Sequence, residues 1–84
     1  MTTTGEIIKS NRLSVNATLQ SVLDAGGPSK AYQSEVENGK RDNVGALTLI
    51  RWCDAIGCDP VFVFAEIVRE TKREAVDKFH GTGI

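Results

Sequence analysis

The chain contains little of what metal sites, redox centres and disulfide frameworks require. Its 84 residues include two cysteines, one histidine and two prolines. Cys53 and Cys58 stand five positions apart, and this spacing matches neither the paired cysteines of a zinc site nor a redox dithiol. We therefore expect two reduced, mostly buried thiols, with no metal ion and no cofactor.

The sequence also lacks the features of membrane proteins, exported proteins and enzymes. No apolar run approaches the roughly 18 residues that a membrane span needs. The first residues, Met1 to Gly5, contain no basic segment followed by an apolar one, so we expect no secretory signal. Neither a nucleophile–base pair nor a phosphate-cradling glycine loop is present. These absences predict a cytoplasmic, non-enzymatic protein without a membrane partner, folded as one domain over residues 1–84.

Helical periodicity, interrupted by glycine and proline, is the pattern that the sequence does contain. Strand-like alternation is absent, which favours an all-α fold. We predict a five-helix bundle with an extended last helix, over about residues 5–12, 17–25, 30–38, 45–56 and 60–79. Trp52 stands three positions after Leu49 and four before Ile56, so we expect it in the core and not stacked on a base.

Capping signals support these boundaries. Thr18 or Asn16 can cap the second helix, and Ser29 is a good cap for the third. Gly39 is expected to end the third helix in the left-handed conformation. Asp59, followed directly by proline, predicts the start of the fifth helix.

The third predicted helix has two chemically different faces. With Val36 set inward, Tyr32, Gln33 and Ser29 fall on the inner side at 100° per residue. The outward side chains are mostly short and polar: Lys30, Ala31, Ser34, Glu35 and Asn38. Such a face can enter the major groove of DNA, although a plain solvated face has the same composition.

Charge along the chain is uneven. Residues 1–41 carry five cations and four anions, a net charge of +1, whereas residues 42–84 carry five cations and seven anions, a net charge of −2. Any surface that binds nucleic acid is therefore expected in the first half, as a local feature and not as a property of the whole chain.

Two segments resemble the phage-repressor family of helix-turn-helix proteins, the Cro-like or xenobiotic-response-element family. The run SKAYQSEVENGKR, residues 29–41, resembles that family's recognition helix and the loop that follows it. The run IRWCDAIGCDP, residues 50–60, resembles its fourth helix and the turn into the fifth. The similarity covers about Thr18 to Phe64. The first predicted helix matches the family poorly. Three residues also depart from its pattern: Leu19 replaces a common glutamine that touches a phosphate, Leu23 a small alanine and Gln33 an apolar residue.

The resemblance implies a helix-turn-helix over about residues 17–38, with its second helix in the major groove of double-stranded DNA. Base contacts would come from four outward residues: Lys30, Ala31, Ser34 and Glu35. Lys30 would donate to guanine, Ala31 would touch a thymine methyl group and Glu35 would accept from cytosine. Glu35 has an alternative role as a partner of Lys30, Arg41 or solvent.

Phosphate contacts are expected beside these residues, at the ends of the second and third helices. The resemblance assigns them to Thr18, Ser29, Asn38, Lys40 and Arg41. The Asn38–Gly39 helix end is expected to expose backbone amides next to the Lys40–Arg41 pair, which together would hold an anion. A solvated turn is the alternative for that pair.

The fifth predicted helix, over about residues 60–79, is apolar nearly all round in its first turns. We predict that Val61, Phe64, Ala65 and Val68 form the inward stripe, which continues to Ala75, Val76 and Phe79. The remaining apolar residues are then free for a homodimer interface: Phe62, Val63 and Ile67. A homodimer would read a palindromic operator, whose half-sites lie about one helical turn apart. Alternatively, the first helix or the N-terminal arm covers these residues.

The function that best fits these patterns is a sequence-specific transcriptional regulator, most simply a repressor. An antitoxin-like interaction protein is the alternative, because members of the family are used to neutralise a partner toxin and to repress their own operon. Its protein partner would bind the charged C-terminal segment, residues 66–84.

Overall fold

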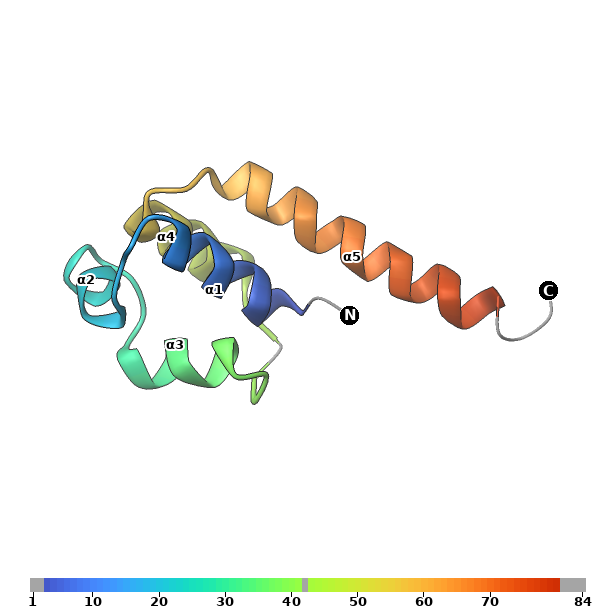
Figure 1. Cartoon of the computed structure of the whole chain (residues 1–84), viewed down its shortest axis with the longest axis horizontal. Helices are drawn as coiled ribbons and strands as arrows, with labels where there is room; N and C mark the ends of the chain where they lie inside the picture. Colours follow the sequence, from blue (N-terminus) through green and yellow to red (C-terminus); the bar gives the residue numbers. More distant parts are fainter. Residues whose placement is uncertain (1–2, 42, 81–84) are drawn as a thin grey trace.

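The computed structural model describes residues 3–41 and 43–80. Over these residues the chain is all-helical and contains no strand, which confirms the predicted fold class. The order of the elements is α1 (Thr4–Ser14), α2 (Leu19–Asp24), α3 (Lys30–Glu37), α4 (Ala46–Ile56) and α5 (Pro60–His80) (Figure 1). In this part of the chain, no helix is both long enough and apolar enough to cross a membrane.

Trp52 lies at the centre of a single apolar core. Its side chain is fully buried, which confirms that this tryptophan belongs to the core. The other buried apolar residues come from all five helices: Ile7, Ile8, Val22, Val36, Leu49, Cys53, Ile56 and Val63. Ala46, three positions before Leu49 in α4, is exposed.

Side-chain caps define where the short helices begin. Thr18 and Ser21 form a reciprocal capping box at the start of α2, and the Ser29 hydroxyl accepts from the amide of Tyr32 at the start of α3. Both expected caps are therefore confirmed. Asn16, the other candidate for α2, instead adopts a φ of 58° in the turn between α1 and α2.

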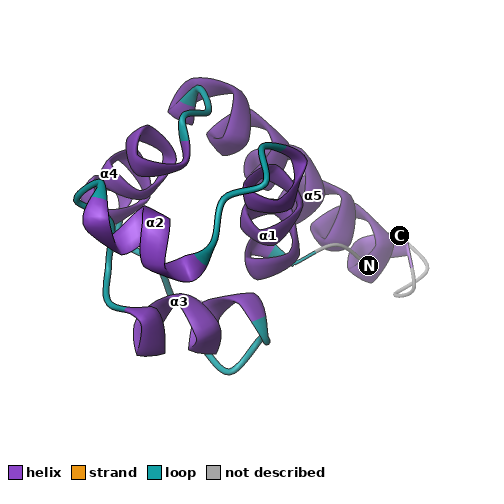
Figure 2. Ribbon diagram, turned by 60° about the vertical axis from the view of Figure 1, so that its left-hand side comes forward, coloured by secondary structure: helices purple, strands orange, loops and turns teal. Residues whose placement is uncertain are grey.

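α3 lies along one edge of the bundle, with α1 and α2 above it in both views (Figures 1 and 2). Its backbone approaches α1 so closely that a Cβ atom at Gly5 would overlap the carbonyl group of Val36. Glycine at this position therefore lets the two helices pack with their backbones in contact. This contact fixes the distance between the backbones of α3 and α1.

α5 is rotated relative to the orientation that the sequence predicted. Val63 is only 1% exposed and Ile67 packs against the core, so these two residues hold α5 to its own chain and are not free for a partner. Val61 and Phe64, expected to face inward, are 73% and 53% exposed, and Ala65 is exposed as well. The predicted inward stripe of α5 is thus wrong at these three residues, whereas its fourth member, Val68, is partly buried.

The physical reason lies in the length of α5. The C-terminal half of the helix extends beyond the bundle (Figure 1), where no core of the same chain remains to be covered. A row of apolar residues that continues along the whole of α5 therefore does not identify the side of the helix that packs on the bundle. The expected continuation at Ala75, Val76 and Phe79 concerns side chains outside the part that the structure describes.

Candidate nucleic-acid interface

The outer face of α3 carries the residues that the sequence placed there. Lys30, Ala31 and Asn38 are exposed, whereas Ser34 and Glu35 are partly exposed. Asn38 donates from Nδ2 to the hydroxyl of Ser34 at 3.1 Å, so these two side chains are ordered relative to each other. The face combines one long cation with small or short polar groups, which allow close approach of the helix backbone to another surface.

Gln33 anchors the inner face at the start of α3. Its side chain is fully buried, and Nε2 donates to the carbonyl oxygens of Leu19 and Pro28, at 3.1 Å and 2.9 Å. These bonds join α3 both to α2 and to the turn between the two helices. This buried polar residue therefore fixes the α2–α3 pair through directed contacts. Among the described atoms, Gln33 Oε1 is buried without a hydrogen-bond partner.

A buried ion pair anchors the other end of α3. Arg12 donates from Nε and Nη2 to the two carboxylate oxygens of Glu37, each at 2.8 Å, and from Nη1 to the carbonyl oxygen of Ala17 at 2.8 Å. The two side chains are 11% and 6% exposed. The hydrogen bond to Glu37 raises the pKa of Arg12, while burial acts in the opposite direction. Arg12 thus joins α1 to the end of α3 by a bidentate contact, and to the turn before α2 by its bond to Ala17.

Neither Arg12 nor Glu37 was identified as structural from the sequence. A signal was present, because Glu37 follows Gln33 by four residues and therefore shares the inner side of α3 with it. Two polar residues at this spacing beside the buried Val36 indicate a polar anchor within the bundle.

The exit from α3 differs from the expectation in one respect. Gly39 has a φ of 76°, as predicted for a glycine that ends a helix. Its amide donates to the carbonyl of Val36, and the amides of Lys40 and Arg41 both donate to the carbonyl of Glu35. The backbone amides are therefore used within the chain, and the expectation that they are free for an anion is wrong. Only the side chains at this exit remain available.

Arg41 is held in place by two contacts. Its Nε donates to Glu35 Oε2 at 3.1 Å, and its guanidinium carbon lies 5.1 Å from the centroid of the Tyr32 ring. Tyr32 in turn packs on Trp52, with ring centroids 5.9 Å apart. The Arg41–Glu35 pair is about half exposed, so its contribution to stability is small. Its effect is positional: it connects the loop after α3 with the core.

Thr18 and Ser29, the two remaining candidates for phosphate contact, stand exposed at the starts of α2 and α3. Their hydroxyl oxygens accept from the amides of Ser21 and Tyr32, at 3.0 Å and 3.2 Å. Because each oxygen serves as an acceptor in a cap, the hydroxyl proton is the group that it can offer to an anion.

The cysteines lie in the core and beside it. Cys53 is buried and Cys58 is partly buried, and both are free thiols. Burial raises the pKa of Cys53 to about 12 and also raises that of Cys58, so both are protonated at neutral pH. Within residues 3–41 and 43–80, no three metal-binding side chains lie together.

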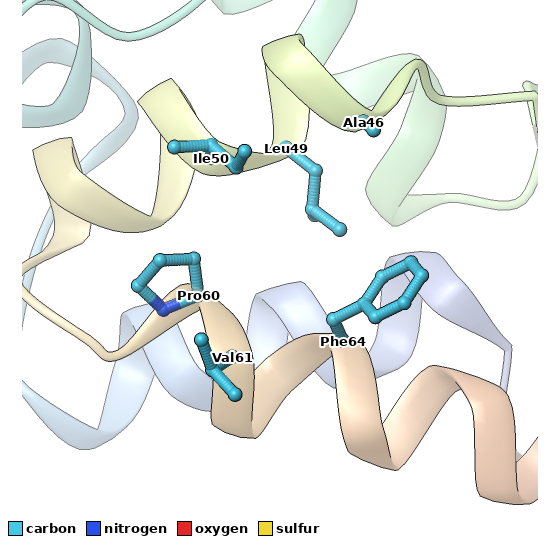
Figure 3. Close-up of a pocket in the computed structure, with 6 residues that line it drawn as sticks. All are labelled: Ala46, Leu49, Ile50, Pro60, Val61 and Phe64. Atoms are coloured by element: carbon cyan, nitrogen blue, oxygen red, sulfur yellow. The ribbon is translucent and has the colours of Figure 1, made fainter.

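A separate apolar feature lies between α4 and α5. It is a groove of about 300 Å³, lined by Ala46, Leu49, Ile50, Pro60, Val61 and Phe64 (Figure 3). Of the residues predicted for dimerisation, only Phe62 is largely exposed, at 60%. Two further apolar residues of α4 that the sequence pattern did not predict to be exposed are Leu47 and Ile50, at 61% and 45%. Their spacing of three, outside the core stripe of α4, was the signal for a second apolar face.

Comparison with known proteins adds no further constraint. The chain matches no protein-family model, no curated protein and no solved structure.

Proposed function

We propose that this chain is a sequence-specific regulator of transcription that binds duplex DNA through α3, as a homodimer on a two-fold operator. The observation that carries the proposal is that different residues of α3 form its buried face and its exposed face. Gln33, Val36 and Glu37 hold its inner face, while the outer face keeps short polar side chains free. The resemblance of residues 29–41 to the recognition helix of phage repressors supports the same assignment.

In this proposal α2 and α3 form a helix-turn-helix, and α3 enters the major groove. Lys30 donates to guanine O6 or N7, Ser34 forms a hydrogen bond with a base edge and Ala31 contacts a thymine methyl group. Each of these residues belongs to the exposed or partly exposed side of α3. None of them makes a contact on which the packing of α3 against the core depends.

Phosphate groups are held by side chains at the ends of the two helices. Lys40 and Arg41 supply the charge, and Asn38, Thr18 and Ser29 supply neutral donors. Lys40 is exposed, and Arg41 is oriented by Tyr32. This set positions the protein on DNA without reading its sequence.

Glu35 takes the second of its two expected roles. Its carboxylate binds Arg41 at 3.1 Å, which supports a function in orienting that cation and not in accepting a hydrogen bond from cytosine. A carboxylate near phosphates is tolerated more easily when a cation is paired with it.

Selection of binding sites from random duplex DNA tests the proposal. The parent protein should yield a palindromic consensus. Lys30→Ala should relax the preference at one or two base pairs, at about 1–3 kcal/mol each, because a direct base contact is lost. Lys9→Ala removes an exposed lysine of α1 and serves as the matched control, which should leave the consensus unchanged.

The same selection separates the two roles of Glu35. Glu35→Gln should raise affinity for all sequences alike if Glu35 only pairs with Arg41, whereas a base contact would alter the consensus at one position. If the parent enriches no sequence, or if Lys30→Ala and the parent give the same consensus, α3 is not the reading helix.

A second candidate function is favoured by the part of α5 that extends beyond the bundle (Figure 1). In an antitoxin-like interaction protein, such a helix would bind and neutralise a toxin. Recovery of a stoichiometric second protein with the chain, expressed from its natural operon, would favour this function. Its loss on truncation of α5 after Thr71 would assign the contact to the extension.

A further inference from the structure

α4 and α5 expose an apolar surface that the fold of the single chain does not use. We define the α4–α5 surface as Leu47, Ile50, Val61, Phe62 and Phe64, which are between 45% and 73% exposed. Three of these residues, Ile50, Val61 and Phe64, also line the groove shown in Figure 3, whose lining contributes no polar side chain. An apolar groove bordered by large exposed apolar side chains is typical of a surface that binds another protein.

The size of this surface fits a protein partner. Aromatic side chains bury roughly 150–250 Å² each and aliphatic ones less, so two aromatic and three aliphatic side chains that are about half exposed offer on the order of 400–500 Å². A stable interface needs about 800 Å² from each partner. Ala65, exposed on the same side of α5, extends the surface. The α4–α5 surface therefore supplies most of the apolar area that a dimer requires.

Charges beside the surface indicate which partner it takes. Asp54 and Asp59 are exposed near the turn between α4 and α5, at the N-terminal end of the surface. Arg69 and Lys72 are exposed about three to four turns further along α5. Arg51 offsets one of the two carboxylates at the first end, and Glu70 is paired with Arg73 at the second. The surface therefore keeps a net negative charge at one end and a net positive charge at the other. Such a surface is complementary to itself when two copies lie antiparallel, and repels itself when they lie parallel.

The spacing along α5 agrees with this antiparallel arrangement. If two copies of α5 cross near Ala65, Lys72 lies about 10 Å from the crossing point along the helix axis, and Asp59 lies about 9 Å from it on the other side. Lys72 of one chain is then placed beside the partner subunit's Asp59, and the pair occurs twice by symmetry. The apolar side chains Val61 and Phe64 lie between these two charge pairs.

We infer that the α4–α5 surface binds the same surface of a second copy of this chain, with the two α5 helices antiparallel. The inference rests on the homodimer of the proposed function and names its interface. No residue that lines the groove comes from α2 or α3, so dimerisation leaves the outer face of α3 uncovered. The interface replaces the one expected from the sequence, because Val63 and Ile67 face the core of their own chain.

Sedimentation equilibrium without DNA tests the apolar part of the interface. The parent should be dimeric at micromolar concentration. Val61→Glu and, separately, Phe64→Glu should raise the dissociation constant by about a hundredfold or more, because each places a charge in the apolar contact. Val61 is 73% exposed in the single chain, so its variant should keep the helical circular dichroism of the parent.

Leu13→Glu is the matched control. Leu13 is 52% exposed and belongs to α1, outside the α4–α5 surface, so this variant should associate like the parent. A monomeric parent would overturn the inference and would assign the surface to a different protein. Unchanged dimerisation of folded Val61→Glu would overturn it as well.

Charge reversal tests the antiparallel orientation. Lys72→Glu should weaken dimerisation about fivefold, because it turns two attractions per dimer into repulsions at an exposed site. Lys9→Glu makes the same change on α1 and should have no effect. Equal dissociation constants for Lys72→Glu and the parent would contradict the antiparallel arrangement.

These measurements are independent of DNA binding. A dimer that selects no DNA sequence would contradict the proposed function and leave this interface in place. Sequence-selective binding by a monomer would contradict this interface together with the homodimer of the proposed function, and would leave the reading of DNA by α3 in place.

Discussion

α3 and α5 each bury one face and expose the other, but α3 does so with polar residues and α5 with apolar ones. α3 is held by polar contacts, through buried Gln33 and Glu37, and exposes short polar groups. α5 is held by the apolar Val63 and Ile67, and exposes large apolar groups such as Phe64. A polar exposed face can bind a hydrated partner such as DNA, whereas an apolar one needs a partner that removes it from water.

The comparison also shows two ways to position a helix. Directed hydrogen bonds define where α3 begins and ends, because a buried polar group that loses its partner is costly. Apolar packing holds α5 without selecting one orientation so strictly, because the helix is apolar on several sides. Three predictions test this contrast, beginning with the largest expected effect.

The polar anchoring of α3 predicts that Arg12→Ala is severely destabilising. The substitution leaves the Glu37 carboxylate buried without its cation, which should lower the free energy of unfolding by about 3–5 kcal/mol. Denaturant unfolding followed by circular dichroism measures this change. Arg69→Ala removes an exposed arginine of α5 and should change the free energy by less than about 0.5 kcal/mol.

An apolar replacement of both partners provides the sharper test. Arg12→Met combined with Glu37→Met should recover most of the lost stability, because no charge is then left buried. Equal losses in Arg12→Ala and Arg69→Ala would show that the Arg12–Glu37 pair does not hold the end of α3, which would weaken the contrast with α5.

Because α3 and α5 expose different faces, removing a cation beside α3 should change DNA binding and leave dimerisation unchanged. Lys40→Ala should weaken binding to all DNA sequences and reduce the steepness of log K against log salt by about 0.9, the value for one lost phosphate contact. The dissociation constant of the dimer should not change, since Lys40 lies outside the α4–α5 surface. Titrations of labelled duplex at several salt concentrations measure the first effect, and sedimentation measures the second.

Lys40→Ala isolates the phosphate contact better than a change at Arg41, whose removal would also leave Glu35 unpaired. A salt dependence identical to that of the parent would remove Lys40 from the DNA-binding surface. A shift in the dimer constant would instead show that the two surfaces are coupled.

An effect confined to high pH, and absent at neutral pH, is expected in the core that both helices share. The pKa of Cys53 is raised from 9.0 to about 12 by burial, so the folded state retains the thiol proton more strongly than the unfolded state does. Its contribution to stability is complete below about pH 9 and is lost as the pH rises towards 12. The free energy of unfolding should therefore fall more steeply from about pH 8 to about pH 11 in the parent than in Cys53→Ala.

Parallel pH curves for the two proteins would contradict the protonated, buried thiol. Tyrosine and lysine side chains also titrate in this range, and the comparison with Cys53→Ala removes their common contribution.

Local signals in the sequence predicted much of the fold. Ser29 and Gly39 mark the ends of α3 because capping and left-handed backbone depend on one residue and its near neighbours. Trp52 was placed in the core because the regular spacing of apolar residues identifies the buried side of α4. The outward position of Lys30 and Ala31 follows from the same helical geometry.

The features that were missed depend on partners distant in sequence. Glu37 binds Arg12 across 25 positions, which the helical pattern of α3 alone does not reveal. The inward side of α5 was wrong because both sides of its first turns are apolar, and the choice depends on where α1 and α4 lie. The amides after Gly39 were expected to be free, although the helix end can bond them to its own carbonyls.

The separation of anchoring and exposed residues on α3 has a consequence for how this protein can change over time. Gln33, Val36 and Glu37 carry the contacts that hold the helix, and none of the four outward positions from Lys30 to Glu35 contributes a side chain to them. Mutations at those four positions can therefore accumulate with little effect on folding. A combinatorial library at these positions should keep its members folded, so that new ligand preferences become accessible on an unchanged scaffold.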